Sequence, residues 1–493
     1  MAAASSANMA VSYLQEQSFD FCFVAYDLGP RAKTGLQVIQ EATLDGARRF
    51  QDTFVLVAEP EQAEVLAGAL EYAPDSCLSK PYDPVRLRQC LDRLARVKQL
   101  LLPLEALLDR EQWAEALGCF EHFQGLYPGV RPYFLRLKGL VLLRLQRYEE
   151  ALALFAGVLQ ERDVDWAHIG QGVALFRLGR YREAQECLLR LTGQHHTAVE
   201  AFILLTLVHR VLGDPGAAQM LLRKAVILQP SMPQLQSDLA NLMALEGDWA
   251  QAVTAWREAL NYARHSPFQR ADDYYGLVQA LLQQIDERQS PASVAAEAEA
   301  VRTLEAAVRD FMGEPVVLFR ARLMGAQIYQ RSGNRSMAEQ AARDAFERYA
   351  ALPLSDQAEL VDPLVDALEF SSLAQASLER RQEVMRRLAT LDWGRANLAG
   401  MVSYRKGHYE QAFDRFREAE ALRGGSPGVV LNLVQSGLRV AVSTPARRAE
   451  ILRQCSDLLF DVRFGVLSHR QQERYRALCR RLGELNRSQG GSG

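Results

Sequence analysis

The sequence predicts a mainly α-helical protein, in which a superhelical array of paired helices follows a small α/β domain. Two observations predict this fold class. Short phrases that end in alanine recur at an almost constant spacing between residues 116 and 252, whereas the first hundred residues hold short apolar runs rich in Phe and Val. The composition agrees with a folded chain, because 48% of the 493 residues are hydrophobic and 24% are charged, as in ordinary globular proteins.

The first hundred residues predict alternating strands and helices. The runs "FCFVAY" at 21–26 and "FVLVA" at 54–58 are short and apolar, and each is followed by a break or by a helical pattern. A third short run precedes the stretch "SKPYDP" at 79–84. Such alternation favours a parallel α/β unit, because parallel strands are joined by helical crossovers and are buried on both faces.

This segment resembles the second half of a bacterial response-regulator receiver domain, which has a flavodoxin-like α/β fold. The resemblance rests on Asp27 at the end of a strand, on Thr34-Gly35 that follows it, and on Lys80-Pro81 after the third run. It implies that Asp27 is the phosphate-accepting aspartate, that Lys80 contacts the phosphoryl group, and that a cis bond precedes Pro81. It also implies phosphorelay signal transduction, with Mg²⁺ as cofactor only if the receiver is functional.

The segment departs from the receiver pattern in ways that argue against phosphorylation. No strand with two acidic residues precedes residue 20, Val57 replaces a hydroxyl residue, and Cys77 replaces an aromatic residue. Because Mg²⁺ needs several oxygen ligands, Asp27 alone is a poor site. We therefore expect a degenerate receiver; a start assigned too far downstream would explain the missing strand equally well.

Without the preceding strands, the run at 21–26 would become an open sheet edge, which can pair with another chain. We therefore expect residues 1–98 to self-associate, or to pack onto the first repeat through apolar residues of the following helix. These residues are Leu87, Leu91, Leu94 and Val97.

The rest of the chain predicts a helical repeat. Phrases such as "GRYREA" at 179–184 and "GDWAQA" at 247–252 end in alanines that are 35, 33, 34 and 34 residues apart, at 116, 151, 184, 218 and 252. In most of these phrases a glycine can end the first helix in the left-handed conformation and an aromatic residue starts the second helix, while the small alanine lets two backbones approach. Leu145-Gln146 replaces the glycine in one unit, and Pro215 replaces the aromatic residue in another. A period near 34 is typical of stacked helix pairs.

This array resembles the tetratricopeptide repeat (TPR) family over most of residues 104–425. We expect a partial receiver-like domain at 1–98, regular repeats at 99–265, and irregular helical pairs at 266–426. Capping helices at 427–487 and a disordered tail at 488–493 would follow.

In this family the first helix of each pair faces a concave groove, so the resemblance implies a set of groove residues. An apolar groove with an arginine rim would suit an amphipathic helix or an extended peptide that carries some acidic residues. The predicted groove residues are Trp166, Ile169, Val173, Phe176, Arg177, Ile203, Leu207, Arg210 and Asn241.

Composition argues against several other classes of protein. The net charge is −3, from 57 Lys and Arg against 60 Asp and Glu, so we expect neither nucleic acid nor a membrane as partner. No apolar run reaches the roughly 18 residues of a membrane span, and the seven cysteines contain no CxxC pair. We expect a cytoplasmic, bacterial protein with reduced thiols.

No phosphate-binding glycine loop and no metal-ligand spacing occur, so we predict neither enzymatic activity nor a bound metal. The predicted function is a protein–protein interaction scaffold in bacterial signalling, with the degenerate receiver used for docking or dimerisation. The alternative is a response regulator in which phosphate on Asp27 controls a TPR output domain.

Overall fold

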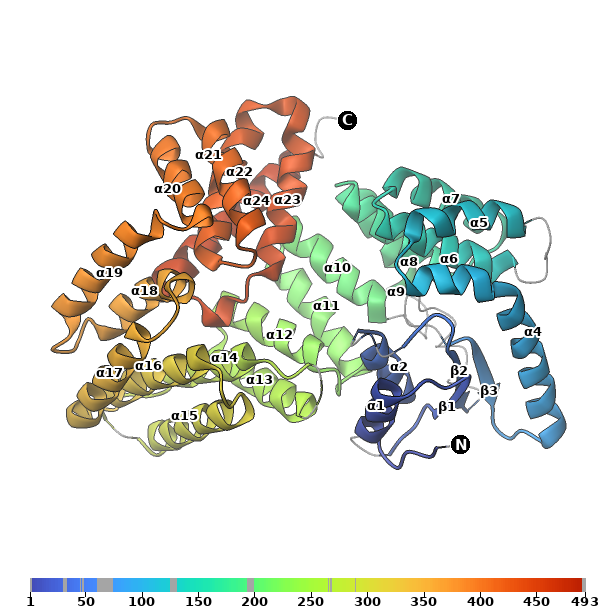
Figure 1. Cartoon of the computed structure of the whole chain (residues 1–493), viewed down its shortest axis with the longest axis horizontal. Coiled ribbons are helices and arrows are strands. Elements are labelled where there is room, and N and C mark those ends of the chain that lie inside the picture. The colour runs from blue at the N-terminus through green and yellow to red at the C-terminus, as the bar shows by residue number, and fades with distance from the viewer. Residues whose placement is uncertain are drawn as a thin grey trace. The chain divides into compact units, whose positions relative to one another are not determined.

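A computed structural model describes residues 2–29, 33–44, 46, 48–59, 74–124, 131–192, 199–264, 266, 268–288 and 290–489. Helices dominate it, and its single sheet lies near the N-terminus (Figure 1). The chain forms two compact units. The first comprises Met1–Val208, Met220–Met232 and His265–Pro267, and the second comprises His209–Gln219, Pro233–Arg264 and Phe268–Gly493.

The N-terminal part is a small α/β domain, as predicted. Its elements are α1 (Ala7–Glu16), β1 (Phe21–Ala25), α2 (Gly35–Leu44), β2 (Thr53–Ala58) and β3 (Ser76–Ser79). The strands are parallel in the order β1-β2-β3, with Phe21 opposite Thr53 and Val55 opposite Ser76. Every residue of β2 is buried, which explains its unbroken apolar run. Strand β1 is an edge, and Phe23 on it is 47% exposed.

One long helix, α4 (Pro84–Asp109), joins this domain to the repeats. The Asp83 carboxylate caps it by accepting a hydrogen bond from the Arg86 N–H at 2.7 Å, and Pro84 occupies its first turn, both favourable at a helix start. Leu87 and Leu94 pack against the sheet, and Val97 packs against the first repeat. The apolar residues that were expected to pack onto the first repeat are thus divided between the sheet and that repeat.

Polar contacts also tie α4 to the α/β domain. Lys98 Nζ donates to the carbonyls of Phe50 (2.7 Å) and Asp52 (3.1 Å) and forms ion pairs with Glu105 (3.0 Å) and Asp75 (3.2 Å). Because Glu105 is fully buried, desolvation raises its pKa to about 7, against the opposing effect of Lys98.

The predicted repeats are present as antiparallel helix pairs. Each aromatic residue that was predicted to start a second helix is the first residue of one: Trp113, Tyr148, Tyr181, Trp249 and Tyr409. The repeat helices that run from the first unit into the second are α5 (Trp113–Gln124), α6 (Arg131–Arg144), α7 (Tyr148–Glu161), α8 (Asp165–Arg177), α9 (Tyr181–Thr192), α10 (Val199–Val211), α11 (Pro215–Leu228), α12 (Pro233–Glu246) and α13 (Trp249–Ala263).

The small residues of the repeat have the predicted roles. All five marker alanines are 0% exposed. Gly179 and Gly247 have φ of +78° and +85°, and Gln146 takes φ +58° where the turn glycine is missing. A Cβ at Gly139 would collide with the ring of Phe155, so the glycine lets the paired helices approach.

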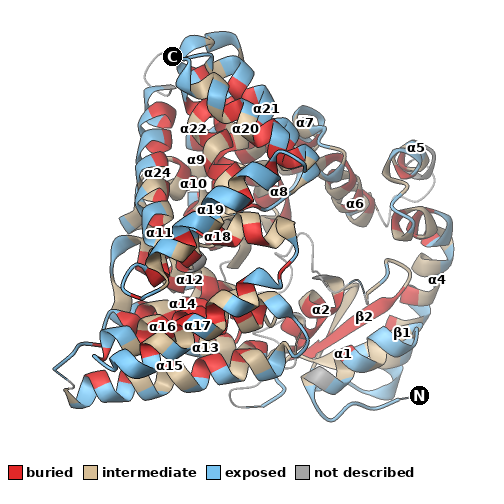
Figure 2. Ribbon diagram, turned by 60° about the vertical axis from the view of Figure 1, so that its left-hand side comes forward, coloured by how far each residue is buried: buried red, intermediate tan, exposed pale blue. Residues whose placement is uncertain are grey.

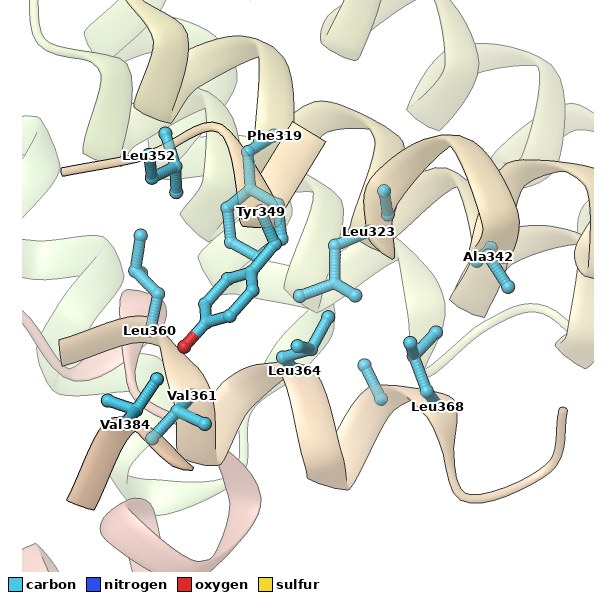
Figure 3. Close-up of a cluster of buried hydrophobic side chains, with 13 residues drawn as sticks. Phe319, Leu323, Ala342, Tyr349, Leu352, Leu360, Val361, Leu364, Leu368 and Val384 are labelled. Carbon is cyan, nitrogen blue, oxygen red and sulfur yellow. The ribbon is translucent and has the colours of Figure 1, made fainter. Parts of the chain in front are cut away.

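The remaining helices continue the stack in the second unit. They are α14 (Ala271–Leu282), α15 (Pro291–Asp310), α16 (Pro315–Arg331), α17 (Arg335–Ala350), α18 (Leu354–Leu368), α19 (Ala374–Leu388), α20 (Asp392–Arg405), α21 (Tyr409–Leu422), α22 (Pro427–Ser443), α23 (Arg448–Asp461) and α24 (His469–Gln489), with short 3₁₀ turns at Pro445–Arg447 and Phe464–Val466. Figure 3 shows the core around Tyr349, which lies between Phe319 and Leu360 and donates its hydroxyl to the Gln357 carbonyl at 2.7 Å.

The C-terminal residues do more than cap the stack. Asn486 Nδ2 donates to the Val211 carbonyl (3.1 Å), and Arg487 Nη1 donates to the Gly213 carbonyl (3.2 Å), at the end of α10. Buried residues lie along one side of α24 (Figure 2). Residues 488 and 489 of the predicted disordered tail belong to α24, and residues 490–493 lie outside the described residues.

Candidate functional site

The predicted phosphorylation residues lie at one edge of the sheet. Asp27 follows β1 and Lys80 follows β3, so both are at the carboxyl ends of the parallel strands, and the Lys80–Pro81 bond is cis. However, Lys80 Nζ lies 3.6 Å from Glu59 Oε1, and Asp27 Oδ1 accepts a hydrogen bond from the Gly29 N–H at 2.9 Å. The part of the chain that the structure describes contains no His, Cys, Asp and Glu group able to hold a metal. Phosphate acceptance by Asp27 stays a prediction.

Three of the predicted groove residues on α8 are packed inside the first unit. Trp166, Ile169 and Phe176 are buried, and the ring of Trp166 meets that of Phe155 edge to face at 6.2 Å. The Phe176 ring meets Tyr181 at 5.5 Å. A partner could contact these three side chains only if the helices moved apart.

Val173, Arg177, Ile203 and Leu207 are partly exposed, so a partner can reach them, and their role in binding stays a prediction.

The last two predicted groove residues contact the chain's own C-terminal part. Arg210 Cζ lies 4.3 Å from the centre of the Phe460 ring, and Asn241 Oδ1 accepts a hydrogen bond from the Gly465 N–H at 3.1 Å. We call residues 463–489 the return segment, because they run back onto α12 and the end of α10. This segment thus occupies the Asn241 side-chain oxygen, although part of the side chain stays exposed.

Close packing and charge hold the start of the return segment in place. Arg463 Nη1 lies 2.7 Å from Asp238 Oδ1. A Cβ at Gly465 would lie 2.8 Å from the Trp256 ring and 3.1 Å from Gly276 Cα. Arg476 donates to the carbonyls of Leu245 (3.0 Å) and Ala244 (3.3 Å). These carbonyls are among those that the last turn of α12 leaves without helical partners.

The second unit contains an open groove of about 700 Å³ beside the return segment. One wall comes from α14, α16 and α18, and the other from the return segment. The polar and charged residues that line it include Tyr275, Gln279, Gln283, Arg320, Gln327, Gln330, Arg331, Asp366, His469, Gln472 and Arg476.

The groove is rich in amide and guanidinium groups. Arg320 Cζ lies 5.4 Å from the centre of the Tyr275 ring. The Tyr275 hydroxyl is buried and has no hydrogen-bond partner within the described residues; the same holds for Asp366 Oδ2. The other oxygen of Asp366 lies 3.5 Å from Arg470 Nε. Both buried atoms are enclosed by the protein, so a ligand in the groove could reach them only if neighbouring side chains moved.

The sequence of α14 contains a signal for this groove. In α14, Tyr275, Gln279, Leu282 and Gln283 line the groove with the same spacing as Ile169, Val173, Phe176 and Arg177 in α8. The residues of α14 lie in the region 266–426, where irregular helical pairs are expected, outside the regular repeats whose positions predict the groove.

A buried carboxylate lies close to the start of the return segment. Asp273 on α14 accepts a hydrogen bond from the Ser237 hydroxyl of α12. Desolvation raises the pKa of Asp273 to about 6, while the Ser237 hydrogen bond and the charge of Arg463 oppose that rise. Asp273 and Asp238 together give Arg463 an acidic environment.

None of the helices in the described part of the chain combines the length and apolar character needed to cross a membrane. The sequence profile of the tetratricopeptide repeat matches residues 105–165 and 169–233. The chain thus contains tetratricopeptide repeats, and the match lies within the region 99–265 where regular repeats are predicted. A comparison with curated proteins finds no match.

Similar solved structures are distant in sequence. A tetratricopeptide repeat protein from Parabacteroides merdae is 14% identical, over 55% of this chain and 97% of its own, with a TM-score of 0.33. The C-terminal part of a TPR repeat-containing protein from Cytophaga hutchinsonii is 12% identical, over 60% and 98%, with a TM-score of 0.36. The human IFIT1 dimer with PPP-AAAA is 17% identical, over 69% and 87%, with a TM-score of 0.31.

Proposed function

We propose that this chain is a protein–protein interaction scaffold that binds an extended segment of a partner protein in the groove between α14, α16, α18 and the return segment. The observation that carries the proposal is the groove itself, which has a volume of about 700 Å³ and is lined by amides and arginines. The repeat match supports the same class of function, because stacked helix pairs form extended concave binding surfaces.

The amide groups favour a polypeptide ligand. Gln279, Gln283, Gln327, Gln330 and Gln472 line the groove, and each side-chain amide carries both donors and acceptors. An extended backbone presents N–H and C=O groups that need such partners once they leave water. The glutamines of α14 and α16 therefore suit a bound peptide backbone, whatever its side chains. The Gln472 amide on the opposite wall is buried and donates to the Leu467 carbonyl at 3.2 Å.

The charges favour acidic side chains on that peptide. Arg320, Arg331 and Arg476 line the groove against Asp366 and Glu369, and Asp366 is engaged by Arg470. Arginine binds carboxylates through paired, charge-assisted hydrogen bonds. An acidic residue of the peptide would pair with Arg320, whose guanidinium already lies over the Tyr275 ring.

We place the α/β domain in the same scaffold as a docking element for bacterial signalling partners or for a second copy of the chain. Its open β1 edge supports this role, because an edge strand has unpaired backbone groups.

The test is capture of a partner from a lysate of the source cells, by the full chain and by the double variant Gln279→Ala, Gln327→Ala. Each lost hydrogen bond costs about 1 kcal/mol, so the variant should bind the captured partner roughly 30-fold more weakly. The matched control is Arg415→Gln on α21, which removes only an exposed ion pair with Glu418. Equal binding by the double variant and the control would refute the proposed groove.

A further inference from the structure

The second unit holds another cavity, of about 420 Å³, where the return segment meets the ends of α10 and α12. Its walls are mainly apolar and come from α12, α23 and α24. The apolar residues that line it are Pro215, Leu242, Leu245, Leu459, Phe460, Tyr475, Cys479 and Leu482. The volume falls within the range of small-molecule sites, about 300–1,000 Å³.

Positive charge surrounds this apolar cavity. Arg210, Arg476, Arg480 and Arg487 line it, against Glu246 and Glu484, and Glu484 is paired with Arg481 at 2.9 Å. The four lining arginines form no ion pair with a carboxylate in the described chain.

The contacts that these arginines do make leave their charge in place. Arg476 and Arg487 donate to backbone carbonyls, and Arg210 stacks on the Phe460 ring. A carbonyl or an aromatic face satisfies a guanidinium without cancelling its charge, so an anion would still be attracted.

The polar groups inside the cavity are neutral and largely satisfied. The Tyr475 hydroxyl donates to the Leu459 carbonyl at 3.0 Å. Burial raises the pKa of the Cys479 thiol to about 11, so the thiol is protonated at neutral pH and adds no negative charge. The interior therefore favours hydrocarbon, and the surrounding arginines favour an anion.

We propose that this cavity binds a small lipophilic anion, a medium-chain carboxylate whose hydrocarbon chain packs between Leu242, Leu459 and Leu482 and whose carboxylate is held by the arginines. A peptide ending in a carboxylate fits less well. Its backbone N–H and C=O groups would enter an apolar cavity with few partners for them, which is costly.

The experiment is calorimetric titration of the full chain with decanoate, octanoate and decanol at fixed pH and salt, below the concentrations at which these compounds aggregate. Each methylene moved out of water strengthens binding by about fourfold. Decanoate should therefore bind with one-to-one stoichiometry and roughly 16-fold more tightly than octanoate. Decanol should bind at least about tenfold more weakly than decanoate, since it has no charge for the arginines.

Two variants locate the site. Arg210→Gln should weaken decanoate binding about tenfold and leave decanol binding unchanged, whereas Cys479→Phe should fill the cavity and weaken both. Arg415→Gln is the matched control, and circular dichroism checks that each variant is folded. If decanoate and decanol bind equally, if several molecules bind per chain, or if a folded Arg210→Gln protein binds decanoate normally, the proposal is wrong. Binding of a C-terminal peptide in place of decanoate would also overturn it.

Discussion

Gly483→Ala tests whether the return segment closes the second unit as the structure indicates. Gly483 on α24 faces Gly213 at the end of α10, and a Cβ at 483 would lie 2.7 Å from Gly213 Cα and 3.1 Å from its N. Carbon atoms normally pack about 3.5–4.0 Å apart. The neighbouring atoms belong to the backbone, so no side-chain rotation can relieve the clash, and α24 would have to move by about 1 Å.

The expected loss of stability follows from two opposing terms. Overpacking of this kind costs about 1–3 kcal/mol, and here we expect the upper end, because the hydrogen bonds from Asn486 and Arg487 to the same turn are strained as α24 moves. Replacement of glycine by alanine inside a helix stabilises the helix by about 1 kcal/mol. The net destabilisation of the second unit should be about 1–2 kcal/mol.

The control is Gly325→Ala on α16, where a Cβ would meet no atom within 4 Å. It should stabilise the unit by up to about 1 kcal/mol, because only the helix propensity changes. Urea unfolding gives the free energies, and hydrogen exchange at the end of α10 shows whether the contact loosens. Equal stability of the two variants would contradict the close contact between α24 and the end of α10. Unchanged hydrogen exchange at residues 210–213 in Gly483→Ala would contradict it as well.

Two further predictions concern the first unit. Burial raises the pKa of Glu105 from 4.5 to about 7. Because the folded chain then binds this proton more tightly than the unfolded chain, the free energy of unfolding falls as pH rises from 4.5 to about 7, by up to about 3 kcal/mol. Glu105→Gln should remove most of this fall in urea unfolding at pH 5 and pH 8, and an unchanged difference would contradict the burial argument. Phe155→Ala should cost about 3–5 kcal/mol, because the ring is fully buried against Gly139, Gly170 and Trp166. Gly170→Ala should be destabilising alone but much less so beside Phe155→Ala, and strict additivity of the two changes would argue against their contact.

Much of the repeat could be predicted because its determinants are local. The marker alanines, the turn glycines and the aromatic residues act within one helix pair, and their spacing reports that pair directly. The apolar runs of β1 and β2 predicted strands for the same reason. Where the glycine is absent, Gln146 adopts the left-handed turn itself, so the pair persists without its sequence marker.

The groove residues were harder to predict, because the exposure of a side chain depends on helices that are distant in the sequence. Trp166 and Ile169 occupy positions that can face a groove, yet neighbouring helices bury them. Conversely, Gln279 and Gln283 lie in a unit without clear repeat markers, yet they line the open groove with part of their surface exposed.

The sequence by itself determined the helix pairs, the small parallel sheet and the helix that joins them, since each depends on residues close together in the chain. Only the tertiary structure decided where the return segment lies. The apolar side of α24 predicts that the helix packs against another part of the protein, but periodicity cannot identify partners that lie 231 to 275 residues earlier. The contacts of Asn486 with Val211 and of Gly465 with Trp256 depend on how many successive helix pairs are placed in space. The return segment that makes these contacts also lines the groove and the apolar cavity described above.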